Sequence, residues 1–474
     1  MKKYILSLAL FLLILTPLFA QQWSTVGYPN FAGGSTPFVF SAVSPGGELY
    51  VAYRDTLYGK ATVKKYSGSN WVTVGNAGFT AGDAYCTTMA FDNNGTPYVA
   101  YMDRANNSRA SEMRFNGSNW EYVGIAGFTP GGTSYTSIAI DKNNTPYVAF
   151  RDQGDTVSNS WPNGFRASVM KFDGANWVYV GSPGFSGGTG PYGALYTSLA
   201  IDKNGTLYVA YCDMSNNFNA AAMKFDGSNW VYVGSPGGFS TGGANNTSIV
   251  IDTNGTPYVG FEDNGYGSKA TVKKFNGTDW APVGTVAFSP GAAEYPSLGI
   301  DRNNKLYLAF EDYGHQKRAS VMTYTGTAWH YVGAPGFSDS TAQYTTIAID
   351  KNNGILYTAY EDVYNENSLN TQYNITAMKY VTSTGINETK HNSSLAVYPN
   401  PTPGIFQINY CTNKKCDAVL KILNAKGEMI FSEKISSAQN EFRKTIDLSN
   451  YAKEIYFIEI ENGEAREVKR VVIE

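Results

Sequence analysis

The sequence is poor in the residues that most metal, redox and nucleophilic sites require. Its 474 residues include only three histidines and four cysteines, which leaves little material for a histidine-rich metal site, a disulfide scaffold or a His-dependent triad. Charged residues make up 16% of the chain and the formal net charge is −3, which excludes a polycation built for nucleic acid. We therefore predict no cofactor, no metal site and no nucleic-acid partner.

Long apolar runs are also missing, except at the N-terminus. Lys2 and Lys3 precede an apolar stretch over residues 5–15, which is followed by Pro17 and a potential cleavage point after Ala20. This is the layout of a secretory signal peptide. The alternative is a membrane anchor, but the stretch is shorter than the roughly 20 residues that span a bilayer. We predict that residues 1–20 are a signal peptide and that no transmembrane segment remains after its removal.

Glycine, proline and aromatic residues are abundant. The chain has 49 glycines, 19 prolines, 35 tyrosines and 25 phenylalanines, and 43% of its residues are hydrophobic. Aromatic residues suit pleated sheets and glycine suits tight turns, so this composition favours many short strands over helices. We therefore predict an all-β fold.

A tryptophan motif recurs with a period of about 50 residues, which is typical of repeat architectures. Each tryptophan is followed three residues later by Val-Gly, and a phenylalanine comes four or five residues after that glycine. Each repeat also holds three further β-rich segments separated by turns, as in residues 135–141, 146–152 and 167–172. Such a unit of four segments predicts a propeller blade, in which the tryptophans are packing residues. The repeated tryptophans are Trp23, Trp71, Trp120, Trp177, Trp230, Trp280 and Trp329.

The two ends of the repeat array complement each other. The last repeat ends with a third segment, residues 375–380, that no tryptophan segment follows, whereas the first tryptophan segment, residues 23–27, has no third segment before it. Pairing these two segments would remove two exposed strand edges. We therefore predict a seven-bladed β-propeller over residues 21–380, with the N-terminal strand closing the last blade.

A second domain follows a polar linker over residues 381–393. Charged residues become more frequent from Ser394 onward. A segment of this size predicts a small Ig-like β-sandwich over residues 394–474. Cys411 and Cys416 are close enough in sequence to close a small disulfide loop, or they stay unpaired. Cys86 and Cys212 fall in different repeats, and we expect them to be separate buried thiols.

Residues 394–474 resemble the C-terminal sorting domain of the type IX (Por) secretion system of Gram-negative bacteria. The resemblance implies handling by the type IX secretion machinery, passage through the outer membrane, and a protein that is secreted or held on the outer cell surface. The alternative is an ordinary accessory sandwich. The residues that carry the resemblance are Tyr398, Pro399, Asn400 and Pro401 with Thr402, Gly404 and Phe406, then 422–427, 446–449, 455–458 and 469–473.

The propeller segments resemble those of secreted NHL-type propellers. The resemblance covers one hairpin in each repeat, as in residues 200–210. It implies the fold and carries no function with it.

Variable loops on one face of the predicted propeller form the candidate ligand site. The loop after Asp152 is long and contains Trp161, and the longer connection into the next repeat contributes Tyr192. Aromatic side chains on polar loops suit the apolar face of a sugar, although plain loop packing is the alternative. Around the channel, the start of the first segment in each repeat gives Tyr135, Tyr196, Tyr295 and Tyr344, interrupted by Phe38, Cys86 and Asn246.

Charged residues recur at the end of the second segment. Each repeat has an aspartate there, and we expect a structural salt bridge to the basic residue that precedes the third segment in five repeats. The residue before the aspartate is basic on one arc and acidic on the other, a split that would orient a polar ligand. These residues are Arg54 and Arg151 on one side, and Glu262, Glu311 and Glu361 on the other.

The near-equivalence of the repeats favours a non-catalytic module that binds a glycan or a surface protein, because catalysis needs one acid and one base rather than seven equivalents. The alternatives are a propeller-type glycoside hydrolase or lyase, and a structural surface protein. Sialidase-like chemistry would draw on Arg54, Arg151, Tyr192 and Glu361. We predict that no residue is catalytic.

Overall fold

The computed structural model describes residues 22–32, 38–55, 57–154, 165–187, 193–365, 371–381, 393–412, 417–435, 441–462 and 465–474. The predicted signal peptide, Trp161, Tyr192 and Cys416 lie outside these ranges, as does most of the predicted linker. The chain divides into two compact units, residues 1–382 and 383–474. Within the described residues, no helix is long and apolar enough to cross a membrane.

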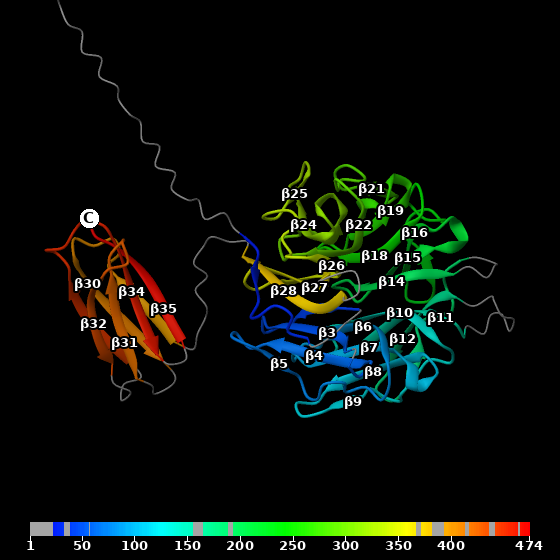
Figure 1. Cartoon of the computed structure of the whole chain (residues 1–474), viewed down its shortest axis with the longest axis horizontal. Coiled ribbons are helices and arrows are strands. Elements are labelled where there is room, and N and C mark those ends of the chain that lie inside the picture. Colours follow the sequence, from blue (N-terminus) through cyan, green and yellow to red (C-terminus); the bar gives the residue numbers. More distant parts are fainter. Residues whose placement is uncertain are drawn as a thin grey trace, which may run out of the picture. The chain divides into compact units, whose positions relative to one another are not determined.

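The first unit is all-β, as predicted, and has a β-propeller fold (Figure 1). Its described residues form seven four-stranded antiparallel sheets. Six sheets take four consecutive strands, and the seventh has the order β1-β28-β27-β26. The first strands of successive sheets lie side by side, and β26 in turn lies beside β2.

The strands of the six consecutive sheets match the predicted segments. The first three sheets are β2 (Phe40–Val43), β3 (Leu49–Asp55), β4 (Lys60–Tyr66) and β5 (Trp71–Thr73); β6 (Ala84–Phe91), β7 (Pro97–Asp103), β8 (Arg109–Phe115) and β9 (Trp120–Tyr122); and β10 (Thr133–Ile140), β11 (Pro146–Asp152), β12 (Arg166–Phe172) and β13 (Trp177–Tyr179). The next three are β14 (Ala194–Ile201), β15 (Leu207–Asp213), β16 (Asn219–Phe225) and β17 (Trp230–Tyr232); β18 (Ala244–Ile251), β19 (Pro257–Asp263), β20 (Lys269–Phe275) and β21 (Trp280–Pro282); and β22 (Ala293–Ile300), β23 (Leu306–Asp312), β24 (Arg318–Tyr324) and β25 (Trp329–Tyr331).

The remaining sheet joins the two ends of the unit. It consists of β26 (Thr341–Asp350), β27 (Ile355–Asn365), β28 (Thr371–Val381) and the short N-terminal strand β1 (Ser24–Thr25). Ser24 pairs with Lys379 and Thr25 with Met378. The outer edge of β28 is thereby covered by a strand from the other end of the chain.

The tryptophan motif links each sheet to the next one. Every repeat tryptophan is buried, and its indole Nε1 donates a hydrogen bond of 2.6 to 2.8 Å to the valine carbonyl of the preceding motif. The phenylalanine of the preceding motif stacks on the same indole, with ring centroids 3.9 to 4.4 Å apart. Trp71 bonds to Val26 and Trp23 bonds to Val332, so the same contact joins the N-terminal strand to its neighbours on both sides. The prediction that the tryptophans are packing residues is confirmed.

The glycine of the motif has a positive φ and lies against that indole. At Gly75, φ is +71° and an added Cβ would lie 3.1 Å from Cδ1 of Trp120. Glycine adopts this backbone conformation without strain and leaves room for the ring. The spacing of the motif is therefore explained by the contacts of the next tryptophan, which needs the valine carbonyl as acceptor, the phenylalanine ring for stacking and the glycine for space.

The aspartates that end the second strands are structural, but the salt bridges predicted at four of the five basic residues do not form. Asp103 accepts hydrogen bonds from the Ala105 amide at 3.0 Å, from Asn106 at 2.8 Å and from the Ser111 hydroxyl at 2.7 Å. Because these donors saturate the buried carboxylate, no guanidinium needs to be desolvated beside it. Within the described residues, no ion pair joins Lys60, Arg109, Lys269 or Arg318 to the opposing aspartate.

Four of these aspartates begin short 3-10 helices that lead into the third strand. Asp103, Asp213 and Asp312 each accept a hydrogen bond from the amide two residues later. This turn fixes the direction of the chain between the second and third strands. The helices are η1 (Arg104–Asn106), η2 (Met214–Asn216), η3 (Asn264–Tyr266) and η4 (Tyr313–His315).

Glu112 is a carboxyl group buried in the core. It lies on β8 at the position that holds Val63 on β4 and Val169 on β12, and it is fully buried. Neither carboxyl oxygen has a hydrogen-bond partner, and burial raises the pKa of Glu112 well above its ordinary value. The folded protein therefore holds this group protonated at a free-energy cost.

The second unit contains two sheets in its described residues. One has the order β29-β30-β33 and the other β32-β31-β34-β35, and a buried cluster that includes Phe406, Leu420 and Ile458 belongs to both. The strands are β29 (Ser393–Tyr398), β30 (Ile405–Thr412), β31 (Ala418–Leu423), β32 (Met429–Ile435), β33 (Glu441–Asp447), β34 (Ile455–Asn462) and β35 (Ala465–Val472).

The Tyr-Pro-Asn-Pro motif holds the C-terminal strand of this unit. The Asn400 side chain donates to the Arg470 carbonyl at 2.7 Å and accepts from the Val472 amide at 2.9 Å. Thr402 pairs with Ile473 in an isolated bridge. At Gly404, φ is +129° and an added Cβ would lie 2.5 Å from the Ser449 Cα, so this position requires glycine.

We expect Trp23→Ala and Trp177→Ala to lower the free energy of unfolding by similar amounts, about 3–5 kcal/mol each. Both indoles make the same hydrogen bond and the same phenylalanine stack. Trp23 differs only in that it lies at the N-terminal end of the unit, far in sequence from the strand that it packs beside. Chemical denaturation of the full chain measures both values. A near-neutral Trp23→Ala beside a costly Trp177→Ala would show that the N-terminal strand is dispensable.

Replacing Glu112 should stabilise the protein at neutral pH. Burial raises the folded pKa, so the titration of this group costs no stability below its unfolded pKa of about 4.3 and lowers stability increasingly as the pH rises above it. Glu112→Val should therefore raise the unfolding free energy at pH 7 by about 2 kcal/mol and flatten its pH dependence between pH 5 and 8. Denaturation curves across that pH range measure this, and a variant less stable than the parent at pH 7 would contradict it.

Candidate functional site

A cavity of about 580 Å³ lies where the first strands of the sheets begin. We call it the mouth cavity. Its lining includes the same repeat position from all seven sheets, together with the two residues that follow it. The seven residues at this position are Phe38, Cys86, Tyr135, Tyr196, Asn246, Tyr295 and Tyr344. The structure thus brings together the four predicted tyrosines.

All seven of these residues have a positive φ, between 49° and 65°. The pairing of first and second strands shifts register here, for example between Ser134 and Ser137, which marks a β-bulge. Large aromatic residues rarely adopt this backbone conformation, and the cost is of order 1–3 kcal/mol each. Strain repeated around one cavity is typical of a functional site, and bulges are a common way to direct a side chain.

Hydroxyl groups connect neighbouring sheets along the wall of the mouth cavity. The threonine after the bulge residue donates to the carbonyl of the bulge residue in the preceding sheet. One residue further on, a serine hydroxyl accepts from a backbone amide of the next sheet, at 3.0 to 3.2 Å. These bonds hold the strained positions in place. The threonine and carbonyl pairs are Thr136 with Cys86, Thr197 with Tyr135, Thr247 with Tyr196, and Thr345 with Tyr295.

The aromatic rings of the mouth cavity form two groups. The Tyr135 and Tyr196 ring centroids are 4.9 Å apart. Tyr295 and Tyr344 are 4.6 Å apart, and Phe38 lies 5.4 Å from Tyr344. Burial raises the pKa of Tyr196 to about 12, with smaller contributions from Tyr135 and nearby acidic groups. The tyrosine hydroxyls therefore remain protonated at neutral pH and are available as hydrogen-bond donors.

Carboxyl groups are concentrated on one side of the mouth cavity. Glu262 and Glu294 belong to its lining, and Glu311 is directly opposite Glu294 in the strand pair. Burial, followed by the charge of Glu294, raises the pKa of Glu311 to about 8. The same two causes raise the pKa of Glu262. Glu294 accepts a hydrogen bond of 2.7 Å from the Tyr313 hydroxyl.

The remaining predicted charged residues are not part of the described lining. Arg54 forms a 3.4 Å ion pair with Asp83 and lies over the Tyr85 ring at 4.6 Å. Arg151 lies over the Phe165 ring at 4.2 Å. Glu361 is buried. Burial, followed by the charge of Glu361, raises the pKa of Tyr344, and burial raises the pKa of Tyr135 against the opposing charge of Arg151.

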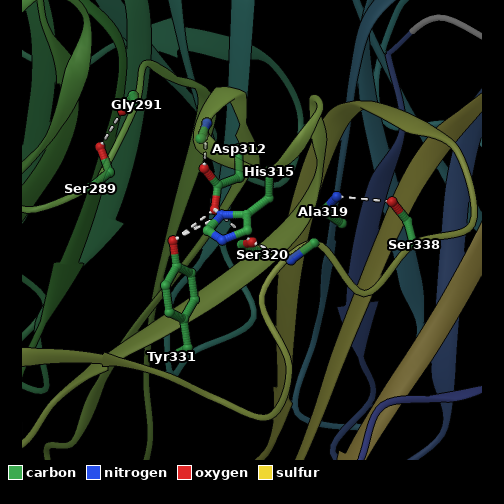
Figure 2. Close-up of polar contacts among 10 residues, drawn as sticks. Ser289, Gly291, Asp312, His315, Ala319, Ser320, Tyr331 and Ser338 are labelled. Atoms are coloured by element: carbon green, nitrogen blue, oxygen red, sulfur yellow. Dashed lines mark hydrogen bonds and ion pairs between the residues drawn. The ribbon is translucent and has the colours of Figure 1, made fainter.

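His315 belongs to a separate polar cluster on the loop between β23 and β24 (Figure 2). Asp312 accepts hydrogen bonds from His315 Nδ1 at 2.9 Å, from the Ser320 hydroxyl at 2.8 Å and from the Tyr331 hydroxyl at 2.9 Å. The cluster matches that around Asp103, with His315 in the place of Asn106. The histidine therefore helps to cap the turn, and it is not part of the lining of the mouth cavity.

The sequence argument missed the threonine and serine residues of the wall, and also two residues that give the cavity its asymmetry. Glu294 and Asn245 each precede a bulge residue, and the equivalent positions hold Ser134 and Leu195, so no repeat signal marks them. Cys86 was predicted to be a buried thiol, but its side chain is only half-buried and lines the mouth cavity, whereas Cys212 is buried as predicted. Within the described residues, no group of three His, Cys, Asp or Glu side chains is arranged to hold a metal ion.

Two protein-family models match parts of the chain. Residues 396–474 match the secretion system C-terminal sorting domain. Residues 24–235 match a family described as BNR repeat-containing family member. No curated protein matches the chain.

Several solved structures have a similar fold. A protein of unknown function from Dyadobacter fermentans is 14% identical, with a TM-score of 0.44, covering 76% of this chain and 98% of that one. A lectin from Aleuria aurantia is 14% identical, with a TM-score of 0.41 and coverages of 65% and 98%. An ulvan lyase, described as a new family of polysaccharide lyase, is 13% identical, with a TM-score of 0.44 and coverages of 74% and 95%. A shared fold at this distance carries no ligand with it.

The tail match agrees with the resemblance seen in the sequence, and its motif residues hold the C-terminal strand in place. The first unit is built of repeated four-stranded sheets. The chain is thus a β-propeller protein that carries a secretion system C-terminal sorting domain and is secreted or held at the outer cell surface.

Proposed function

We propose that this protein is a non-catalytic glycan-binding module and that the mouth cavity takes the sugar. The observation that carries the proposal is a single cavity lined by four tyrosines, by threonine and serine residues, and by Glu262 and Glu294. Sugars present apolar faces that stack on aromatic rings, and hydroxyls that bond to carboxylates and amides. A cavity of about 580 Å³ has the size of a typical small-ligand site.

The proposal includes a specific architecture. The first unit is a seven-bladed propeller over residues 21–380, closed by the N-terminal strand, and residues 1–20 are its signal peptide. A linker over 381–393 leads to an Ig-like sandwich over 394–474, which the type IX secretion machinery handles. The cycle of indole–carbonyl bonds through Trp71 and Trp23 supports the closure. The two sheets around one buried cluster support the sandwich.

The charge distribution favours one orientation of the ligand. Carboxyl groups gather near Tyr295, and Arg151 lies on the side of Tyr135. The Glu294 carboxyl group accepts hydrogen bonds from sugar hydroxyls, whereas Glu311 behind it, whose pKa is raised to about 8 by burial and the charge of Glu294, limits the local negative charge below that pH. Trp161 and Tyr192, on the long loops, are proposed as further contacts to the same glycan.

A glycoside hydrolase or lyase is the second candidate, and one observation favours it. Burial and the charge of Glu294 raise the pKa of Glu311 to about 8, so this group stays protonated at neutral pH, as a general acid in glycoside cleavage must. However, Glu311 is only 1% exposed and is not part of the described cavity lining. Binding is therefore the better-supported function.

Truncating the tyrosines of the mouth cavity should weaken glycan binding. We expect Tyr295→Ala to reduce the affinity for a glycan-array ligand at least about tenfold, since the stacking of the sugar on the ring and the burial of the ring are lost. Tyr295→Phe keeps the ring and should retain most of the affinity. Tyr451→Ala, at an exposed tyrosine of the second unit, is the matched control and should change nothing.

The same array gives the outcomes that would end the proposal. Absence of any bound sugar in the parent protein removes the glycan-binding function and leaves a protein-binding or structural role. Trp161→Ala tests the long loop separately. The double variant should lose more glycan affinity than Tyr295→Ala alone only if both residues touch the same ligand. Unfolding curves of each variant exclude a loss of structure.

The coupling between the two opposing carboxyl groups is also testable. Glu294→Gln removes one charge, so the pKa of Glu311 should fall from about 8 but stay above its ordinary value, because burial is the larger cause. A pH titration followed by NMR of carboxyl-labelled glutamate measures this shift. An unchanged pKa would show that the two groups do not interact.

Turnover separates the second candidate from the first. Incubation with a panel of glycosides and acidic polysaccharides should yield no product if the mouth cavity only binds. Product formation that Glu311→Gln and Glu294→Gln both abolish would overturn the binding proposal in favour of catalysis.

A further inference from the structure

Three further cavities lie between neighbouring sheets at the opposite ends of the strands. Each is formed by the second and third strands of one sheet together with the turns of the next sheet. We name them after the second strands that flank them: the β3/β7, β7/β11 and β15/β19 grooves. They are distinct from the mouth cavity, because the first strands run from the mouth cavity to the turns that line these grooves.

A tyrosine and a basic residue face each other across the strands that line these grooves. Tyr208 pairs with Lys224 in one sheet, and Tyr258 pairs with Lys274 in the next. The same pairing recurs in the other sheets of the unit with one exception. In that sheet Tyr307 pairs with Thr323, and Lys305 lies over the Tyr307 ring at 5.5 Å. The other equivalent pairs are Tyr50 with Lys65, Tyr98 with Arg114, Tyr147 with Lys171, and Tyr357 with Lys379.

In the β3/β7 groove the cations are neutralised by the protein itself. Lys65 forms a 3.1 Å ion pair with Glu48, and Arg114 forms a 2.8 Å ion pair with Glu121. Asp92 also lies in the lining. No positive charge is left over for a ligand in this groove.

The β7/β11 groove is balanced in a similar way. It shares Arg114, with its ion pair to Glu121, and it contains Lys171. Asp141 and Asp173 line the same groove, and the charge of Lys171 contributes to lowering the pKa of Asp173. Two cations therefore face two carboxylates.

The β15/β19 groove is different. Its lining contains Lys224 and Lys274, and within the described residues neither lysine forms an ion pair. Asn276 stands where the β7/β11 groove has Asp173, so the turn contributes no charge. Asp226 lies near Lys224 but on the preceding turn, outside the lining.

Asp252 is the one carboxylate of this lining. Its Oδ1 accepts hydrogen bonds from the amides of Asn254 and Thr256, both at 2.8 Å, as the aspartates of the equivalent turns do in the other two grooves. Two lysines therefore face one carboxylate in a groove of about 630 Å³, which also presents Tyr208 and Tyr258.

We propose that the β15/β19 groove binds an acidic polysaccharide, with a carboxylate or sulfate group between Lys224 and Lys274 and the sugar ring beside the tyrosines. Ammonium groups bind both anions, and an aromatic ring beside them favours a sugar over a free ion. This site does not depend on the mouth cavity. One chain would then hold a glycan at two places, which raises its retention on a polymer.

Affinity electrophoresis of the full chain in gels with dextran sulfate, polygalacturonate or dextran tests the proposal. We expect retardation by at least one of the two charged polymers and none by dextran. Lys224→Gln with Lys274→Gln should weaken that binding about tenfold or more, because two charge contacts are lost. The charged polymer that retards the chain identifies the anion as sulfate or carboxylate.

Lys65→Gln with Arg114→Gln is the matched control, since it removes two cations from the self-neutralised groove. It should change the affinity less than about twofold, and Lys224→Arg with Lys274→Arg should retain binding. Equal losses in the two Gln double variants would show diffuse attraction and overturn the proposal. So would a parent chain that no charged polymer retards, or that dextran retards equally.

Discussion

The hydrogen bond from each indole to the valine carbonyl of the preceding motif is the interaction on which the first unit depends. It joins neighbouring sheets whose strands do not pair with each other, and it is buried, so breaking it leaves both a donor and an acceptor unsatisfied. The phenylalanine stack and the close approach of Gly75 to Trp120 set the position of the ring. Every other feature of the unit, including its two kinds of cavity, is built on sheets spaced by this contact.

The two ends of the strands serve different purposes. At the mouth cavity, seven equivalent residues have a strained backbone conformation, six of them at a shift in strand register, and inter-sheet hydroxyl bonds hold four of them in place. At the other end, tight turns are held by their own aspartates, as at Asp252. Strain at one end and relaxed turns at the other are what a binding face on a rigid scaffold requires.

Function in such a repeat lies where the repeat is broken. Glu294 and Asn245 replace Ser134 and Leu195 beside the bulge, and Asn276 replaces an aspartate in one groove. Glu112 breaks the repeat too, but in the core, where its unpartnered carboxyl only costs stability. Residues that differ from the repeat and face a cavity therefore point to function, whereas residues that differ and face the core do not.

The sequence by itself determined the all-β class, the tryptophan-based packing, the two-unit organisation and the C-terminal sorting domain. Each of these rests on a local pattern whose physical cause, such as the Val-Gly spacing, lies within one repeat. It also placed Tyr135, Tyr196, Tyr295 and Tyr344 around one opening, because equivalent positions of a repeat meet there.

Only the tertiary structure decided how charges and hydroxyls are partnered. Four of the five expected salt bridges to the aspartates do not form, because turn amides and hydroxyls reach those carboxylates first, as at Asp103. The bulge, the pairing of Glu294 with Glu311 and the free lysines of the β15/β19 groove each involve residues from different strands or sheets. Partnership of this kind depends on distances across the fold, which spacing along the chain does not encode.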